Sequence, residues 1–194
     1  VERSRGLGDV YKRQVAEHIK SDHTEVICSP DQFFEAIPQV IKAIESYDIT
    51  TVRASVGNWL VCKEIRKQCD CKVVFNGDGA DEVFGSYLYF KKAPSNEEFE
   101  EESARLLTDI YHYDVLRSDR SISTHGLEAR TPFLDKQFVA ISRAVATEYR
   151  LRPQSEVKTC NEKWILRVAF EETGLLPREV LWRRKEAFSD GVSV

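Results

Sequence analysis

The feature that most constrains the fold of this chain is a short apolar run that leads directly into a glycine turn. The run KVVFN covers residues 72–76, and continuous apolar runs of this length are typical of parallel strands buried on both faces. The turn GDG follows at residues 77–79, and we expect a helix to begin at Ala80 or Asp81. A strand, a tight turn and a helix in this order predict an α/β protein with a parallel sheet.

The carboxyl end of such a strand is the usual place for an α/β protein to hold a phosphate, because open amides and the helix dipole converge there. Gly77 and Gly79 would let backbone amides approach phosphate oxygens without a Cβ in the way. Asp81 and Glu82 would repel phosphates unless a magnesium ion bridged the two groups. The other interpretation is a plain turn followed by an exposed acidic helix start, and the loop alone leaves both open.

Helices and short strands alternate through the first half of the chain, and the second half is predominantly helical. Ser29 and Gln32 have the spacing of a capping box, and Pro38 should kink or split the helix that follows. Thr50 or Thr51 is expected to cap the next helix, because a hydroxyl can accept from an amide of the first turn. The remaining predictions are a helix that ends within residues 15–21, a strand at 24–28, helices at 135–145, 161–173 and after Pro177, and a core face made by Val52, Val56, Trp59 and Leu60 with the Lys63 stem at its rim.

Composition excludes several classes of protein. The chain has 194 residues with 42% hydrophobic and 31% charged residues, which fits a soluble globular domain. No apolar run approaches the roughly 18 residues that a membrane span needs. The net charge of −4 gives no electrostatic footprint for nucleic acid or for an anionic membrane. The sequence therefore predicts neither a nucleic-acid partner nor a membrane partner.

The five cysteines point to a reducing, cytoplasmic setting. Their number is odd, no Cys-x-x-Cys pair occurs, and the four-ligand spacing of a zinc site is missing even around Cys69 and Cys71. We therefore expect buried or idle thiols.

The start of the chain differs from the rest. Residues 1–14, VERSRGLGDVYKRQ, show no apolar periodicity and no signal peptide, and the chain contains no methionine at all. We expect residues 1–14 to be a foreign or artefactual segment and residues 15–194 to be part of a longer protein.

A second candidate for chemistry is the cationic sequence WRRKE at residues 182–186. A run of charges is often only a solvated helix face. The alternative is that the fold brings Lys185 to a phosphate, where it would stabilise charge on a leaving group.

Four segments together resemble the synthetase domain of the glutamine-dependent asparagine synthetases. The first is VVFNGDGADEVFGSYLYFKKAPS, which is similar to the second nucleotide motif of that family. The others are SYDITTVRAS at 46–55, YDVLRSDRSISTHGLEARTPFLDK at 113–136 and LPREVLWRRKEAFSDGV at 176–192. They occur in the family's order, and the resemblance runs from about Val15 to the last residue.

The resemblance implies an α/β fold, namely a partial parallel sheet of the ATP-pyrophosphatase (adenine nucleotide α-hydrolase-like) kind with a helix-rich C-terminal half. It implies that the parent protein activates aspartate with ATP and Mg²⁺ to give β-aspartyl-AMP and pyrophosphate. Ammonia, released from glutamine by a domain absent here, would then displace AMP to form asparagine. A homodimer of the full-length protein is compatible with the family.

The resemblance also assigns roles by motif match. Asn76 and Gly77 match ATP-binding positions, and Lys185 matches a lysine that contacts the α-phosphate. The remaining matches are Asp78 with Glu82 and Lys185 as catalytic residues, Asp81 as the magnesium ligand, and Tyr87, Asp114 and Arg117 as aspartate-binding residues. Arg130 and Asp135 we expect to form a structural ion pair near the loop.

The chain also departs from the family pattern. Asn76 stands where the family has Ser, and Asp78 is one methylene shorter than the usual Glu. The family's Ser-Gly-Gly-x-Asp-Ser-Ser loop, which cradles pyrophosphate, does not occur in this sequence. Two alternatives follow: a β-lactam synthetase-like relative that closes a ring without ammonia, and a catalytically inactive fragment.

Overall fold

The computed structural model describes residues 7–150 and 162–183, without the side chains of residues 7–10. These residues fall into two compact units. The sheet unit comprises Glu25–Gly79 and Ala104–Ala140, and the helical unit comprises the described parts of Val1–Thr24, Ala80–Ser103 and Ile141–Val194. We describe each unit by itself.

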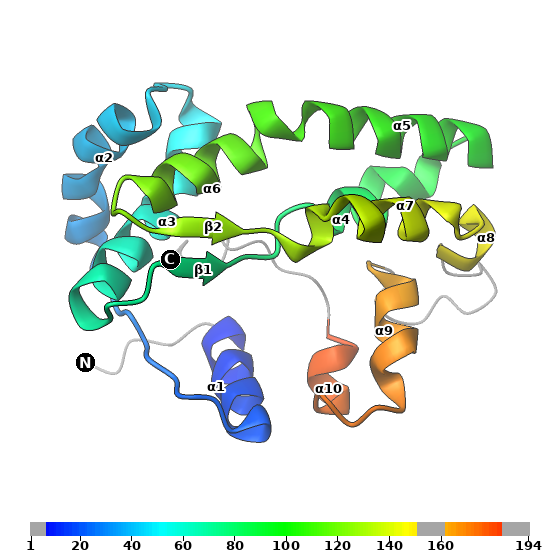
Figure 1. The fold of residues 1–194 in the computed structure, drawn as a ribbon, viewed down its shortest axis with the longest axis horizontal. Helices are drawn as coiled ribbons and strands as arrows, with labels where there is room; N and C mark the ends of the chain where they lie inside the picture. The colour runs from blue at the N-terminus through cyan, green and yellow to red at the C-terminus, as the bar shows by residue number, and fades with distance from the viewer. Residues whose placement is uncertain (1–6, 151–161, 184–194) are drawn as a thin grey trace. The chain divides into compact units, whose positions relative to one another are not determined.

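The sheet unit is built from three packed helices and two short parallel strands (Figure 1). Its elements in chain order are α2 (Pro30–Ile44), α3 (Ile49–Gln68), β1 (Val73–Phe75), the 3₁₀ turn η2 (Ile110–His112), α6 (Asp114–Ser123), β2 (Glu128–Arg130) and the 3₁₀ turn η3 (Pro132–Leu134). Strand β1 pairs in parallel with β2, with Val74 opposite Ala129. The chain is thus mixed α/β, helix-rich, with a small parallel sheet.

The core of the sheet unit lies where its helices meet. The predicted apolar face of α3 is confirmed, because Val52, Val56 and Trp59 are buried against α2, and Lys63 Nζ lies 4.9 Å from the centre of the Trp59 ring. A second cluster, formed by Cys62, Ile122 and Leu127, joins α3 to α6, and Val74 and Ala129 of the two strands pack against it. The sheet is therefore attached to the helices through its central residues.

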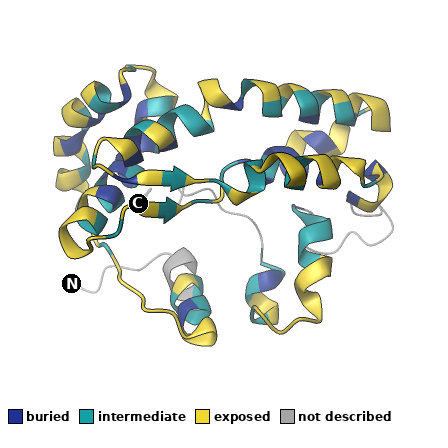
Figure 2. Ribbon diagram, in the orientation of Figure 1, coloured by how far each residue is buried: buried dark blue, intermediate teal, exposed yellow. Residues whose placement is uncertain are grey.

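The prediction that residues 72–76 form a strand buried on both faces is correct for the strand and wrong for the burial. Among the residues of β1 only Val74 is partly buried, whereas Phe75 is 73% exposed and Val73 is also exposed. Figure 2 shows the two strands largely in the exposed colour. Alternate residues of a strand point to opposite faces, and the described residues of this unit cover one face alone.

The predicted capping box at Ser29 is confirmed, and the predicted cap of the next helix, α3, is wrong. The capping box is confirmed, since Ser29 Oγ accepts from the Gln32 amide and Gln32 Oε1 accepts from the Ser29 amide. Helix α2 nevertheless continues through Pro38 without being split, because the carbonyl of Phe34, which loses its donor, is on an exposed turn that water can reach. Helix α3 is capped by Asp48, and not by a threonine: its Oδ1 accepts the Thr51 amide at 2.7 Å.

The helical unit contains α1 (Leu7–Ile19), α4 (Ala80–Val83), the 3₁₀ turn η1 (Leu88–Lys92), α8 (Thr147–Arg150), α9 (Trp164–Glu171) and α10 (Arg178–Leu181), of which α9 and α10 lie side by side (Figure 1). Two further helices, α5 (Asn96–Asp109) and α7 (Lys136–Ala144), have residues in both units. The predicted helix starts at Ala80 and after Pro177 are confirmed. The predicted strand at residues 24–28 is wrong, because this segment has no regular structure.

Helix α1 runs through Gln14 and Val15, where the sequence predicts a junction with foreign residues. Gln14 Nε2 donates to Glu179 Oε1 at 2.7 Å, and the His18 ring contacts the Gly174 carbonyl at 2.8 Å. The foreign origin of residues 1–14 stays a prediction that the gene sequence upstream of Val15 would test. Among the described helices, none is long and apolar enough to cross a membrane.

Candidate functional site

The first group of predicted site residues lies in the loop after β1, within the sheet unit. The Asn76 amide donates to the Arg130 carbonyl at 2.9 Å, so strand pairing reaches one residue past Phe75. Asn76 Oδ1 then accepts the Asp78 amide at 3.1 Å, which closes a side-chain turn over Gly77. Asn76 Nδ2 is buried and has no hydrogen-bond partner in the part of the chain that the structure describes.

The two glycines of this loop differ in what an added Cβ would meet. A Cβ at Gly77 would meet nothing within 4 Å, so the space beside its backbone is open. Gly79 has a φ of +89°, and a Cβ there would lie 2.2 Å from Leu134 Cδ2. Only Gly79 is therefore required by the fold itself, while Gly77 leaves room for a ligand.

Asp78 is a partly buried carboxyl of the loop. Burial raises its pKa, and three neighbours oppose that effect: the Ser118 hydroxyl, the Arg117 charge and the Asn76 side chain. Ser118 Oγ donates to Asp78 Oδ2 and is 5% exposed. A partly buried carboxyl whose pKa is shifted by burial and by specific neighbours is the kind of group that functional sites use.

Helix α6 supplies the residues that face this loop. Arg117 forms an ion pair with Asp114, three residues earlier on the helix, and both side chains are about a quarter exposed. Arg117 also acts electrostatically on Asp78. The sheet unit thus brings together Asn76, Asp78, Arg117 and, through its ion pair with Arg117, Asp114.

The second group of predicted site residues lies on α4 and directly after it, in the helical unit. Glu82 is only 4% exposed, and it accepts a hydrogen bond of 2.5 Å from the Tyr87 hydroxyl at Oε1. The Ser103 hydroxyl donates to the Glu82 carbonyl at 2.8 Å. Asp81 Oδ1 lies 3.3 Å from Lys163 Nζ. Tyr87 and Glu82 are therefore one hydrogen-bonded pair, and Asp81 has a cation beside it.

A buried arginine holds the end of α4. Arg150 is 1% exposed, and its Nη1 donates to the Val83 carbonyl at 3.2 Å. It forms an ion pair with Glu100, which also accepts the Thr147 hydroxyl at 2.5 Å. The guanidinium lies 5.2 Å from the centre of the Phe99 ring. These contacts fix the short helix that carries Asp81 and Glu82.

Two predictions about individual residues need separate comment. Lys185 lies outside the described residues. The predicted ion pair between Arg130 and Asp135 is wrong: Arg130 pairs with Glu128 at 2.6 Å, and Asp135 caps α7 by accepting the Gln137 and Phe138 amides at 3.0 Å. Glu128 lies on the same strand as Arg130, and Asp135 lies directly before the first turn of α7. Each of the two residues therefore has a nearer partner than the other.

Sequence reasoning missed Ser118 and Lys163. Ser118 follows Asp114 by four residues and so lies on the same face of α6, which helix periodicity could have indicated. Lys163 approaches Asp81 from more than 80 residues away, and only the folded chain could reveal it.

The carboxylates of the candidate site could hold a metal ion only together with other ligands. Within residues 7–150 and 162–183, no cluster of three or more His, Cys, Asp or Glu side chains could bind an ion by itself. Mg²⁺ is commonly held by one or two carboxylates together with substrate phosphates and water. Asp81, which is partly exposed, fits as one such ligand for a metal that arrives with a nucleotide.

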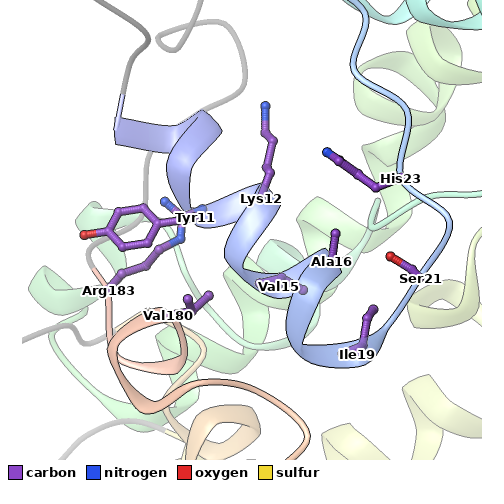
Figure 3. Close-up of a pocket in the computed structure, with 9 residues that line it drawn as sticks. All are labelled: Tyr11, Lys12, Val15, Ala16, Ile19, Ser21, His23, Val180 and Arg183. Atoms are coloured by element: carbon purple, nitrogen blue, oxygen red, sulfur yellow. The ribbon is translucent and has the colours of Figure 1, made fainter.

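A pocket of about 330 Å³ lies elsewhere in the helical unit (Figure 3). Side chains of α1 line it together with Val180 and Arg183, whose guanidinium lies 5.5 Å from the centre of the Tyr11 ring. None of the predicted site residues that the structure describes lines this pocket. It therefore neither supports nor weakens the assignment of the loop.

Comparisons with known proteins match almost the whole chain. The family model described as asparagine synthase matches residues 9–101 and 91–194. Glutamine-hydrolyzing asparagine synthetases are 51% identical in Gallus gallus, 50% in Homo sapiens and 49% in Mus musculus, in each case over 181 residues. Those residues are 93% of this chain and 31% of each relative, so the chain spans a little under a third of these curated proteins.

Proposed function

The chain belongs to the asparagine synthase family, and on that premise we propose that the full-length protein makes asparagine from aspartate, ATP and glutamine-derived ammonia. The observation that carries the proposal is the 50% identity to the human enzyme over 93% of the chain. The relatives that share this identity are named glutamine-hydrolyzing asparagine synthetases.

The proposed chemistry is activation of the aspartate side-chain carboxylate by ATP. Carboxylate oxygen is a poor leaving group and AMP is a good one, so formation of β-aspartyl-AMP with release of pyrophosphate makes attack by ammonia feasible. The step concentrates negative charge at the α-phosphate, which fixed cations and dipoles must offset. We assign Lys185 to that charge.

The loop after β1 is the proposed nucleotide contact of the sheet unit. A parallel strand pair with an open loop at its carboxyl end supports an ATP-pyrophosphatase-type fold, because ligands of such sheets bind there. Asn76 Nδ2 is buried and without a hydrogen-bond partner among the described residues, so it is a donor that a ligand oxygen could satisfy, and Gly77 leaves the approach open. We propose that both bind ATP.

Aspartate has two carboxylates and an ammonium group, and α6 offers complementary charges. Arg117 would bind a carboxylate, and Asp114, held beside it, would bind the ammonium. Asp78 would act on the adenylate. It lies on the same loop as Asn76, and the charge of Arg117, on α6, acts on its carboxyl.

In the helical unit we propose Glu82 as a catalytic acid, with Tyr87 as a substrate-binding residue that also orients it. Asp81 would hold Mg²⁺, which when bound neutralises phosphate charge. Lys163, whose Nζ lies 3.3 Å from Asp81 Oδ1, would be a second cation beside that metal. A cytoplasmic location and a homodimer of the full-length protein stay predictions.

The proposal is tested by pyrophosphate release from the full-length protein. We expect release that requires both aspartate and ATP, and asparagine as the product when glutamine is present. Replacing Lys185 by alanine should lower the rate of adenylation by roughly 100- to 1,000-fold, because one preorganised charge contact is lost. Lys136→Ala, at an exposed lysine on α7, is the matched control and should leave the rate unchanged.

Four results would each contradict one part of this proposal. No aspartate-dependent pyrophosphate release would remove asparagine synthesis, and a cyclised product formed without ammonia would favour the β-lactam synthetase-like alternative. An unchanged rate in Lys185→Ala would remove that lysine from the site. We expect the isolated 194-residue chain to be inactive, and turnover of ATP and aspartate by that chain would overturn this expectation.

A further inference from the structure

The contact between Ser118 and Asp78 links helix α6 to the loop after β1. It joins two residues 40 positions apart, and the hydroxyl that donates is 5% exposed. The carboxylate is partly buried, with Asn76, Arg117 and Ser118 as the groups that favour its charged form. Hydrogen bonds to charged groups in such places are stronger than neutral ones.

Ser118 has a second acceptor within reach. Its Oγ lies 3.3 Å from the carbonyl of Val115, three residues earlier on the same helix. A hydroxyl carries one hydrogen and two lone pairs, so it can donate to only one of these oxygens at a time. The serine can therefore exchange partners by rotating its O–H bond.

We infer that Ser118 is a positioning residue that holds the Asp78 carboxyl against α6 in both of its protonation states. When Asp78 is ionised, the serine hydroxyl donates to Oδ2. When Oδ2 carries a proton, that proton is donated to Ser118 Oγ, and the serine hydrogen turns to the Val115 carbonyl. No proton leaves the serine, and no buried polar atom loses its partner in either state.

This inference deepens the proposed function, on which its catalytic consequence rests. A catalytic carboxyl that gains or loses a proton in water-poor surroundings would otherwise swing toward solvent in its charged form. Arg117 favours only the charged carboxyl, because a guanidinium donates and cannot accept, and it is also paired with Asp114. The serine hydroxyl accepts as well as donates, so it can also serve the neutral carboxyl.

The helix provides its own control. Ser121 lies on α6 as well, is fully buried, and its Oγ has no hydrogen-bond partner within the described residues. Ser118→Ala and Ser121→Ala thus remove the same atom from the same helix, and only the first removes a contact with Asp78. Ser118→Thr keeps the hydroxyl and is the conservative rescue.

The first test measures the Asp78 carboxyl directly by ¹³C NMR titration of the 194-residue chain, with circular dichroism to check that each variant is folded. We expect the pKa of Asp78 to be higher in Ser118→Ala than in the wild type and unchanged in Ser121→Ala and Ser118→Thr. An unchanged pKa in Ser118→Ala, or an equal rise in Ser121→Ala, would overturn the inference. This result does not depend on what reaction the protein catalyses.

The second test uses the full-length protein and pyrophosphate release. We expect Ser118→Ala to lower kcat by about tenfold with less than a twofold change in the KM for aspartate, because the carboxyl is misplaced while the substrate contacts remain. Ser118→Thr should restore most of the rate. A rise in KM at constant kcat would assign Ser118 to substrate binding and overturn the positioning role. A wild-type protein without aspartate-dependent release would refute the proposed function, while the NMR result would still decide the fate of the inference.

Discussion

Replacing Arg150 by methionine should destabilise the helical unit strongly. Methionine keeps an unbranched stem for the contact with Phe99 but removes the charge and all donors. The change leaves the Glu100 carboxylate without its ion-pair partner and the Val83 carbonyl without its donor. Breaking a buried ion pair on one side typically costs about 3–5 kcal/mol.

The structure sets the cost near the lower end of that range. The Glu100 side chain is 30% exposed and keeps the Thr147 hydroxyl, so part of its charge can be rehydrated. The loss of the Val83 hydrogen bond adds about 1 kcal/mol, since that carbonyl is capped by Arg150. We expect the free energy of unfolding to fall by about 3–4 kcal/mol.

Urea unfolding followed by circular dichroism and tryptophan fluorescence measures this loss. Arg178→Met is the matched control, because its side chain is 83% exposed and its ion pair with Glu171 spans 3.4 Å; we expect a change below about 0.5 kcal/mol. Adding Glu100→Gln to Arg150→Met should recover part of the loss, since the unpaired charge is then gone. A loss below about 1 kcal/mol, or one equal to that of the control, would refute the assignment of Arg150 as the support of α4.

Two further predictions concern the loop after β1. Gly79→Ala should destabilise the chain by about 1–3 kcal/mol, because the residue has a φ of +89° and an added Cβ would meet Leu134. Gly77→Ala should cost less than about 1 kcal/mol, because a Cβ there would meet nothing within 4 Å. Equal losses of the two variants in urea unfolding would contradict this interpretation. Asp78→Asn should become more stable relative to the wild type as the pH rises. Burial raises the pKa of Asp78 in the folded chain, so the stability linked to its proton is fully present below its unfolded pKa and is lost as the pH rises through the folded pKa. Urea unfolding at pH 4 and pH 7 should show that the free energy of unfolding of Asp78→Asn, minus that of the wild type, is larger at pH 7. An equal difference at both pH values would contradict the prediction.

Local signals in the sequence predicted the local structure well. The capping box at Ser29 and the apolar face of α3 depend on residues three or four positions apart, and both are present. The cap of α3 was assigned to a threonine because hydroxyls and carboxylates are nearly equivalent caps, and periodicity does not distinguish neighbouring candidates. The exposure of Phe75 could not be predicted, because burial depends on which other elements cover a strand.

The candidate site was predictable to the extent that it is contiguous in sequence. The glycine turn with Asp81 and Glu82 indicates a candidate loop by itself, whereas the roles of Asn76, Asp78 and the residues of α6 come from the resemblance. Ser118 and Lys163 were not found, since each acts on a carboxyl that lies far away along the chain. Pairing across such distances is determined by tertiary packing, and a single sequence contains no direct sign of it.

The parallel pairing of β1 with β2 also sets an order of events during synthesis. Val73 pairs with Glu128, so the ribosome adds about 55 residues between the two partners. At typical elongation rates of roughly 5–20 residues per second, β1 waits about 3–11 seconds for its neighbour. Helix α3, made earlier, can already shelter Val74 through Ile65 and Cys62 during that time, whereas the apolar side chain of Phe75 stays accessible to chaperones even after β2 arrives.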